Sequence, residues 1–466
     1  MENYQVVVIG GGPGGYESAI RLSQYGIGVA VVEKERLGGV CLNWGCIPTK
    51  TLVKSAELVR EIQESESYGL PAVDFTPDYK AIWERKNTIV ESLVGGIEYL
   101  YRKRKIPVYN SAVTRICKTS GAYELQMADG NSVSAQYIIL ATGSTSKSLP
   151  GITIDEVNVL SSTGILKLDT LPKSLAVVGG GVIGCEFASI YATLGVQVTI
   201  IEFLPRLIAL EDEEISKRLA IAFKKSGIKV MLNVGVKSIQ STDGKQILKL
   251  SDDNELEAEK VLLSVGREPV FDIQTEGFEL IRQRGAMVID SYMRTNVPDI
   301  YAIGDLTAKL QLAHTASKQG LLAVEHIKIQ ITGEAKPLHP LSYTDIPRCT
   351  FTNPEIASVG YTEAQAKEVF GEITVGKFPF SASGKAMAMS STQGFVKTIA
   401  RKDKGELVGM HIMGPQAAEL IAQGAIMIAK KMKAEDIHDI VFAHPTLSEA
   451  IMESVEDLLD LSIHKI

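Results

Sequence analysis

The hydrophobic and polar positions of the chain begin with an arrangement that predicts two strands around one helix. An apolar run at Tyr4–Ile9 is followed by the glycine-rich turn Gly10–Gly15 and by helical periodicity to about Tyr25. A second apolar run at Val29–Glu33 ends in an acidic residue. Short apolar runs predict buried strands, and a change to a period of 3.6 predicts a helix. The start of the chain therefore predicts a βαβ unit.

The same arrangement recurs in the middle of the chain. A strand is predicted at Leu175–Val178, a turn at Gly179–Gly184, a helix to about Leu194 and a second strand at Val196–Glu202. Two independent turns would rarely share both this pattern and its spacing. We interpret the recurrence as an internal duplication.

Both turns have the spacing Gly-x-Gly-x-x-Gly, which is the fingerprint of a dinucleotide site when it lies between a strand and a helix. Gly10 allows the tight turn, Gly12 lets the backbone approach a pyrophosphate, and Gly15 lets the helix pack closely. In both copies the acid lies 23 positions after the first glycine, at Glu33 and Glu202. Such an acid accepts hydrogen bonds from a ribose. The sequence thus predicts two dinucleotide sites, and a glycine turn without a ligand is the less favoured alternative.

The last third of the chain has a different pattern. Apolar alternation predicts an antiparallel sheet, interleaved with helices, and no glycine fingerprint occurs. The predicted strands are Ala357–Val359, Thr374–Phe378, Val396–Ile399 and Leu407–Ile412, and the predicted helices are Glu363–Val369, Ala417–Lys430 and Leu447–Ser462. The predicted fold class is α/β, with two Rossmann-like domains and a C-terminal α+β domain. We interpret this last domain as a dimer interface.

Composition narrows the class of protein. The 466 residues carry a net charge of -7, which gives little reason to expect nucleic-acid binding. No uncharged apolar run reaches the length of a membrane span, and no charged leader precedes a hydrophobic run. Five cysteines in a chain of this length do not make a disulfide framework. We expect a cytoplasmic protein in a reducing compartment, with no metal site.

Two of the cysteines lie close together, in the segment Gly38–Lys50. Cys41 and Cys46 precede a long helical pattern, so both sulfurs are expected near a helix N-terminus, which favours a thiolate. A disulfide closing so small a ring would be reducible. The alternative is two buried, inert cysteines.

Small-residue turns follow three other predicted strands. They are Ala141–Ser144, Ser264–Pro269 and Gly304-Asp305. The carboxyl ends of strands in an open parallel sheet are where ligands bind. Asp305 could equally be a helix N-cap, and both roles can hold together.

The segment His444-Pro-Thr-Leu-Ser-Glu449 is the candidate for acid–base chemistry. Pro445 suits a helix start. A carboxylate that binds one imidazole nitrogen leaves the other free to accept a proton. Taken alone, His444 is more often a structural histidine than a catalytic one.

Together these motifs, in this order, resemble the flavoprotein disulfide reductases over essentially the whole chain. The resemblance implies a homodimer that uses FAD and NAD and oxidises protein-bound dihydrolipoamide. Its partners would be lipoylated proteins of 2-oxoacid dehydrogenase or glycine cleavage complexes. The implied domains are an FAD domain at 1–148, an NAD domain at 149–270, a central segment at 271–340 and a dimerisation domain at 341–466.

The resemblance also implies roles for individual residues. Lys50 would lie near the flavin ring and pair with Glu186. The remaining FAD positions are Gly10, Gly12, Gly15, Glu33, Ala112, Thr142, Gly143, Ser144, Asp305 and Ala313. The implied NAD positions are Gly179, Gly181, Gly184, Glu202, Val236 and Gly266.

In the implied mechanism, Cys41 exchanges with the substrate and Cys46 faces the flavin. His444, supplied by the partner subunit and held by Glu449, removes the thiol proton. Glu202 favours NAD because a carboxylate repels a 2′-phosphate, and Arg206 alone is weak evidence for NADP.

Three alternatives have specific signatures. Glutathione reductase would require NADP-binding arginines after the second fingerprint, where this sequence has Glu202. Mercuric reductase would require a C-terminal cysteine pair, which this sequence lacks. A complex-docking flavoprotein would not require the cysteine pair or the His444–Glu449 pair, which are both intact. Two positions depart from the family pattern, Trp44 inside the cysteine segment and Arg348 beside Cys349.

Overall fold

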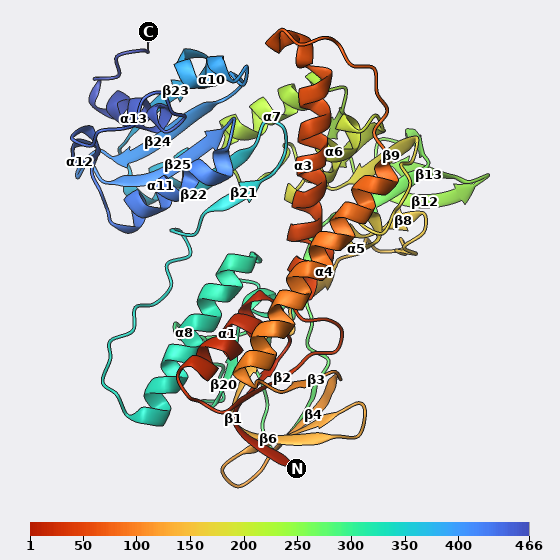
Figure 1. Ribbon diagram of the computed structural model, residues 1–466, viewed down its shortest axis with the longest axis vertical. Coiled ribbons are helices and arrows are strands. Elements are labelled where there is room, and N and C mark those ends of the chain that lie inside the picture. Colours follow the sequence, from red (N-terminus) through yellow and green to blue (C-terminus); the bar gives the residue numbers. More distant parts are fainter. Residues whose placement is uncertain (466) are drawn as a thin grey trace. The chain divides into compact units, whose positions relative to one another are not determined.

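The computed structural model describes residues 1–465, and the statements below concern that part of the chain (Figure 1). The chain forms two compact units. Unit 1 comprises 1–51, 81–147 and 266–343, and unit 2 comprises 52–80, 148–265 and 344–466. Each unit is described by itself.

Unit 1 is built on an eight-stranded sheet with the order β17-β4-β5-β6-β1-β2-β3, in which β20 also pairs with β6. Four of its strands, β2, β1, β6 and β20, are parallel neighbours whose carboxyl ends meet at one edge. The strands are β1 (Glu2–Ile9), β2 (Val29–Val32), β3 (Val108–Tyr109), β4 (Val113–Lys118), β5 (Tyr123–Met127), β6 (Ser132–Leu140), β17 (Gln274–Glu276) and β20 (Ile300–Ala302). Two small ribbons complete the unit, β7 (Ser144–Ser146) with β16 (Arg267–Pro269) and β18 (Arg282–Gln283) with β19 (Ala286–Met287).

Helices α1 (Pro13–Gln24) and α8 (Ala313–Thr332) lie side by side in unit 1 (Figure 1). Their apolar residues and those of α4 (Tyr79–Arg104) form one core with β1, β2 and β20, in which Val6, Val31 and Tyr301 are fully buried. The first glycine turn connects β1 to α1. The cysteine-containing segment Gly38–Lys50, called the redox segment below, comes after β2. Helix α2 (Gly39–Trp44) is short, and α3 (Cys46–Gln63) begins at the second cysteine. A 3₁₀ turn, η1 (Ser65–Tyr68), follows α3 in unit 2, and η2 (Gly304–Thr307) follows β20 in unit 1.

The nucleotide-fingerprint region of unit 2 repeats the parallel arrangement, with the strand order β11-β10-β9-β15-β8. Its strands are β8 (Val159–Leu160), β9 (Ser174–Val178), β10 (Gln197–Glu202), β11 (Lys229–Leu232) and β15 (Lys260–Leu263). The helices are α5 (Ser162–Ile165), α6 (Val182–Thr193) and α7 (Glu213–Lys225), and an antiparallel sheet is formed by β12 (Val236–Thr242), β13 (Lys245–Leu250) and β14 (Glu255–Ala258).

A five-stranded antiparallel sheet with the order β21-β22-β25-β24-β23 lies in the C-terminal part of unit 2. The strands are β21 (Arg348–Thr350), β22 (Ile356–Gly360), β23 (Ile373–Pro379), β24 (Phe395–Arg401) and β25 (Leu407–Met413). The helices are α9 (Glu363–Phe370), α10 (Gly384–Ala388), α11 (Ala417–Ala429), α12 (Ala434–His438) and α13 (Glu449–Glu456), with 3₁₀ turns η3 (Phe380–Ala382) and η4 (Asp457–Leu459).

The fold class is confirmed, with two βαβ units and a C-terminal α+β region. The sequence predicts a helix over Asp212–Ser226, and α7 lies within these bounds because Asp212 caps it, accepting a hydrogen bond from the Glu214 N–H at 3.1 Å. Two expectations at the C-terminus are wrong. The last helix is shorter than predicted. α13 ends at Glu456, η4 continues to Leu459, and Asp460, with a left-handed φ of 58°, ends that turn. The helix also begins at Glu449, after the predicted start at Leu447, and Pro445 lies before it.

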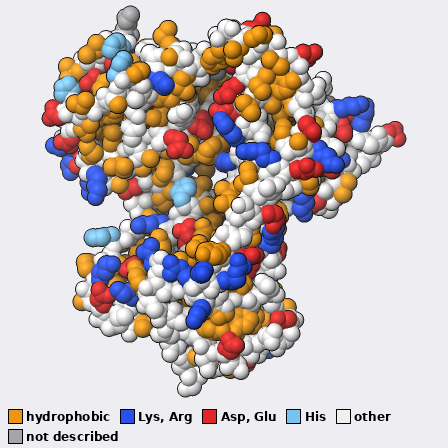
Figure 2. All heavy atoms as spheres, viewed as in Figure 1, with side chains coloured by type: hydrophobic (Ala, Val, Ile, Leu, Met, Phe, Trp, Pro, Cys, Tyr) orange, Lys and Arg blue, Asp and Glu red, His pale blue; other side chains and the backbone are white. Residues whose placement is uncertain are grey.

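Acidic and basic side chains are interspersed with hydrophobic ones on the face in view in Figure 2. Among residues 1–465 we find no helix whose length and apolar content would suffice to cross a membrane.

Candidate active site

The first glycine turn forms a cradle that tolerates no side chains at its ends. A Cβ on Gly10 would lie 2.2 Å from the Ala141 carbonyl oxygen, and a Cβ on Gly15 would lie 1.9 Å from that of Gly10. Gly12 caps α1 without any side-chain hydrogen bond, and a Cβ there would meet only the Cα of Gly39, at 4.0 Å. The first turn of α1 therefore presents backbone N–H groups in a space lined by backbone, which suits a phosphate.

The second turn, in unit 2, has the same geometry. A Cβ on Gly179 would lie 2.6 Å from the Ser264 carbonyl oxygen, and a Cβ on Gly184 would lie 2.0 Å from that of Gly179. Gly181 caps α6 without a side-chain hydrogen bond, and no atom lies within 4 Å of its Cβ position.

The acids at the ends of the second strands are also held alike. Glu33 accepts hydrogen bonds from the N–H groups of Gly11 at 2.6 Å and Glu35 at 2.8 Å. Glu202 accepts from the N–H groups of Gly180 at 2.5 Å and Leu204 at 2.7 Å. Each carboxylate uses one oxygen per N–H, so each keeps lone pairs for ribose hydroxyls. Both cradles thus fit a dinucleotide, and the internal duplication extends to these contacts.

The redox segment is attached directly to the first cradle. The Gly38 N–H donates to the Gly11 carbonyl oxygen at 2.8 Å. A Cβ on Gly39 would lie 2.7 Å from the Cα of Gly12, and Gly39 has a left-handed φ of 55°. This packing places the start of α2 against the turn that would hold a pyrophosphate.

Cys41 lies in α2 and Cys46 is the first residue of α3. A hydrogen bond shared with Cys46, together with burial, raises the pKa of the Cys41 thiol. The positive charge of Lys50, one turn further along α3, acts in the opposite direction. The two sulfurs therefore lie within hydrogen-bonding reach of each other, but the raised pKa of Cys41 does not favour the thiolate that was expected at a helix N-terminus. Their expected disulfide stays a prediction.

A polar cluster occupies the strand ends of unit 1. The Ser144 hydroxyl donates to Asp305, and the Thr142 hydroxyl donates to the Val270 carbonyl oxygen at 2.5 Å. Asp305 lies in η2 and does not cap it, so the N-cap alternative is wrong. Its carboxylate remains at the carboxyl edge of the parallel strands, where the sequence placed it.

His444 and Glu449, in unit 2, form the predicted pair. His444 Nδ1 lies 2.9 Å from Glu449 Oε1, and the Thr446 N–H donates to Oε2 at 2.7 Å. Burial would raise the pKa of Glu449, but these two hydrogen bonds outweigh it and hold that pKa below its usual value. An ionised carboxylate only accepts, so Nδ1 carries the proton and Nε2 is left as a base.

The other predicted site residues lie as follows. Ala313 is the first residue of α8, and Val236 is the first residue of β12. Ala112 precedes β4, and its carbonyl oxygen accepts a hydrogen bond from the Ala128 N–H. Gly143 and Gly266 have left-handed φ angles of 75° and 122°. Glu186 is buried on α6 and accepts from the Phe351 N–H at 2.9 Å. Lys50 belongs to unit 1 and Glu186 to unit 2, so their pairing stays a prediction.

Sequence reasoning missed two residues of the site. The Asn43 amide donates to the carbonyl oxygens of Leu37 and Gly39, each at 3.0 Å, and so holds the redox segment in shape. Arg267 donates to the Ser144 hydroxyl at 2.8 Å and lies 3.7 Å from Asp305. Burial lowers the pKa of this guanidinium. A cation directly after the small-residue turn at Gly266 was the available signal.

Among residues 1–465, no group of three or more His, Cys, Asp or Glu side chains is arranged to hold a metal ion.

Two family profiles match the chain. The pyridine nucleotide-disulphide oxidoreductase profile covers residues 4–320, and the dimerisation domain of the same family covers residues 346–455. Together they span both fingerprints, the redox segment and the His444–Glu449 pair.

The chain is also similar to named proteins over nearly its full length. It is 41% identical over 479 residues to a dihydrolipoyl dehydrogenase of Corynebacterium glutamicum, with 98% of each chain covered. It is 39% identical over 471 residues to one of Chlamydia muridarum, covering 99% of this chain and 98% of the relative. Among solved structures, LpdA from Mycobacterium tuberculosis has a TM-score of 0.88 at 25% identity, covering 98% of this chain and 100% of the other. The HOCl-induced flavoprotein disulfide reductase RclA from Escherichia coli has a TM-score of 0.85 at 27% identity, covering 97% and 99%.

Proposed function

Because the chain belongs to the pyridine nucleotide-disulphide oxidoreductase family, we propose that it oxidises protein-bound dihydrolipoamide to lipoamide and reduces NAD⁺ to NADH. Relatives named dihydrolipoyl dehydrogenase, 36–41% identical over nearly the whole chain, support this activity. The structural observation that carries it is the attachment of the Cys41–Cys46 segment to the first dinucleotide cradle through Gly38 and Gly39.

The chain's own residues account for the thiol chemistry. His444 Nε2, supplied by the partner subunit, takes the proton of one substrate thiol. The resulting thiolate attacks Cys41 of a Cys41–Cys46 disulfide, so that a mixed disulfide forms with Cys41 and Cys46 leaves as a thiolate. The second substrate thiol then closes the lipoamide disulfide and releases Cys41, so two protons and two electrons leave the substrate. Glu449 fixes the His444 tautomer and stabilises the imidazolium that forms.

The cofactor positions follow from the two cradles. FAD would be held by the first fingerprint with Glu33, by Ala112, Thr142, Gly143 and Ser144, by Asp305 and Ala313, and by Lys50 paired with Glu186. When bound, FAD supplies a two-electron relay between the cysteine pair and NAD⁺. NAD would be held by the second fingerprint with Glu202, Val236 and Gly266.

We assign residues 1–148 to an FAD domain, 149–270 to an NAD domain, 271–340 to a central segment and 341–466 to the dimerisation domain. Three of the five places where the compact units change, 147/148, 265/266 and 343/344, lie within about five residues of these boundaries, whereas residues 52–80 are grouped with unit 2. The chain carries the family's dimerisation domain, which supports a homodimer. We further infer lipoylated partners of 2-oxoacid dehydrogenase or glycine cleavage complexes, and a cytoplasmic location.

One steady-state comparison tests the function. The protein is assayed with dihydrolipoamide and NAD⁺, and separately with glutathione disulfide and NADPH. We expect the first pair to turn over at least a hundredfold faster. Faster turnover of the second pair would replace the proposal by a glutathione reductase.

A further inference from the structure

A row of polar side chains crosses the five-stranded antiparallel sheet of unit 2. The strand register aligns one residue from each strand, so that each lies opposite the next. In order across the sheet they are Arg348 on β21, Ser358 on β22, His411 on β25, Lys397 on β24 and Lys377 on β23, and we call them the polar row. Directly opposed residues lie on the same face of a sheet. One face of a largely buried sheet therefore carries three cations and an imidazole.

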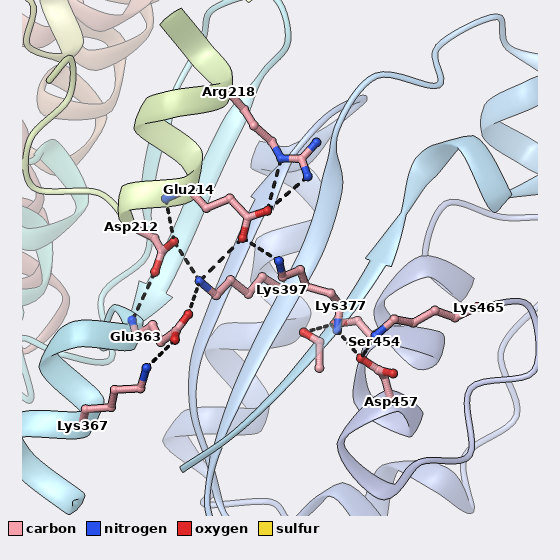
Figure 3. A network of polar contacts seen from close by, with 11 residues as sticks. Asp212, Glu214, Arg218, Glu363, Lys367, Lys377, Lys397, Ser454, Asp457 and Lys465 are labelled. Carbon is pink, nitrogen blue, oxygen red and sulfur yellow. Dashed lines mark hydrogen bonds and ion pairs between the residues drawn. The ribbon is translucent and has the colours of Figure 1, made fainter. Parts of the chain in front are cut away.

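Carboxylates from two helix starts meet the polar row. Lys397 Nζ lies 2.9 Å from Asp212 Oδ1 and 2.7 Å from Glu363 Oε2, and the side chains of Lys397 and Asp212 are each only 3% exposed. Lys377 Nζ lies 2.8 Å from Glu214 Oε2. Figure 3 shows Asp212 and Glu214 reaching from the start of α7 toward these two lysines.

Arg348 forms the end of the row at β21. Its Nε lies 3.1 Å from Glu211 Oε1, and its terminal nitrogen donates to the Ser358 hydroxyl at 3.1 Å. Arg348, which departs from the family pattern, is thus paired with the buried carboxylate of Glu211. Every cation of the row is paired with an acid from Glu211–Glu214 or from Glu363.

His411 is the titratable member of the row that carries no charge at neutral pH. It is fully buried, and its Nε2 lies 2.9 Å from the Tyr361 carbonyl oxygen, so Nε2 must donate. Burial lowers the pKa of His411 and outweighs the nearby carboxylates of Asp212 and Glu211. The row therefore presents three positive charges to the acids around it.

The energetics of such pairs favour a positional role. A buried ion pair contributes about as much stability as well-packed apolar residues of the same volume, because desolvation offsets the attraction. An apolar face would hold α7 on the sheet but would let it slide along the strands. Pairs with fixed partners allow one register only.

The register of α7 on the sheet fixes the position of the segment between Glu202 and Asp212. The Glu211 N–H donates to the Ile208 carbonyl oxygen, and the Ile208 N–H donates to that of Gly180, each at 2.8 Å. Gly180 in turn donates its N–H to the Glu202 carboxylate. A continuous set of hydrogen bonds thus joins the partners of the polar row to the second fingerprint.

The backbone of this segment is strained at one point. Ile208 has a φ of 39°, in the left-handed region that a β-branched residue rarely occupies. Such a conformation persists only where the surroundings determine it from both sides. Here the second fingerprint holds one side and the partners of the polar row hold the other.

We propose that the polar row positions the nucleotide-binding segment 202–212, so that Lys397 and Arg348 are positioning residues for NAD⁺ binding. This inference rests on the proposed function, in which the second fingerprint takes NAD. It assigns to the C-terminal sheet a part in nucleotide affinity in addition to dimerisation.

The test uses the holoenzyme with Lys397→Met, which keeps the side-chain length and removes the charge. We expect ADP-ribose, titrated calorimetrically, to bind at least 10-fold more weakly and the KM for NAD⁺ to rise in parallel. The anaerobic rate of flavin reduction by dihydrolipoamide should stay within twofold of the wild type, since it depends on Cys41 and Cys46. The control is Lys217→Met, which breaks an exposed pair with Glu213 on the same helix and should leave every value unchanged.

A double variant, Asp212→Asn with Lys397→Met, distinguishes a loss of affinity caused by lost positioning from one caused by an unpaired buried charge. It leaves no unpaired charge at Asp212, and Asn still caps α7. We expect its Tm to recover while ADP-ribose binding stays at least 5-fold weaker. Recovery of both Tm and affinity, or wild-type affinity in Lys397→Met, would overturn the inference. Should Lys397→Met alone fail to fold, the double variant carries the same test. Absence of ADP-ribose binding in the wild type would instead contradict the proposed function.

Discussion

Replacement of Glu449 by Gln tests the proposed base most sharply. The carboxylate now accepts from both the Thr446 N–H and His444 Nδ1, at 2.7 and 2.9 Å. An amide can accept only one of these bonds, and its NH₂ group would favour the His444 tautomer with the proton on Nε2. That tautomer cannot remove a thiol proton.

The expected loss follows from the bond that disappears. A charge-assisted hydrogen bond contributes about 1.5–3 kcal/mol. The His444 side chain is 80% exposed, so the lower part of this range applies. About 1.5–2 kcal/mol corresponds to a roughly 10- to 30-fold slower reaction.

The assay is anaerobic stopped-flow reduction of the flavin by dihydrolipoamide. Glu456→Gln is the matched control, because Glu456 lies on the same helix and meets His438 Nδ1 at 3.2 Å. Reduction by NADH, which does not use His444, should be unchanged in both variants. A Glu449→Gln rate within twofold of the wild type would refute the assignment, and so would an equal loss in Glu456→Gln.

Three further predictions concern the cradle, the nucleotide and acid stability. Gly15→Ala should yield protein without FAD, because its Cβ would lie 1.9 Å from a carbonyl oxygen. The control Gly95→Ala, which has open space around it in a helix, should raise the free energy of unfolding by about 0.5–1 kcal/mol and keep FAD. Flavin absorbance after gel filtration distinguishes the two variants, and FAD retained in Gly15→Ala would contradict the cradle. Glu202→Ala should reduce the preference for NAD⁺ over NADP⁺ at least 10-fold in kcat/KM, and an unchanged ratio would remove Glu202 as the determinant. Burial would raise the pKa of Asp212, but its interactions with His411 and Lys397 hold that pKa below its usual value. Its stabilisation is therefore present above the unfolded pKa of about 3.9 and is lost as pH falls through the lower folded value. Urea midpoints between pH 7 and pH 3 should fall less steeply for Lys397→Met than for the wild type, and identical slopes would contradict the pairing.

The sequence was sufficient where local chemistry determines structure. The two glycine turns were identifiable because only glycine can approach a carbonyl oxygen as Gly15 approaches Gly10. Helix α7 was predictable because Asp212 is a strong N-cap. The pairing of His444 with Glu449 also followed from short spacing along the chain.

Features that depend on distant segments were not accessible in this way. Helix α8 was not predicted as a helix, although it packs beside α1 across nearly 300 residues of sequence. Arg267 meets Ser144 only because β16 pairs with β7. The polar row requires the register of five strands, and no single strand shows more than one of its members.

The central claim is that electrons pass from a dithiol through Cys41 and Cys46 to NAD⁺. The most direct test mixes the oxidised holoenzyme with dihydrolipoamide and NAD⁺ and follows the absorbance of NADH, comparing wild type with Cys41→Ser and Cys46→Ser. We expect one NADH for each dihydrolipoamide oxidised by the wild type and at least a thousandfold slower NADH formation by either variant, with FAD retained in both. NADH formation at the wild-type rate by either serine variant would contradict the account.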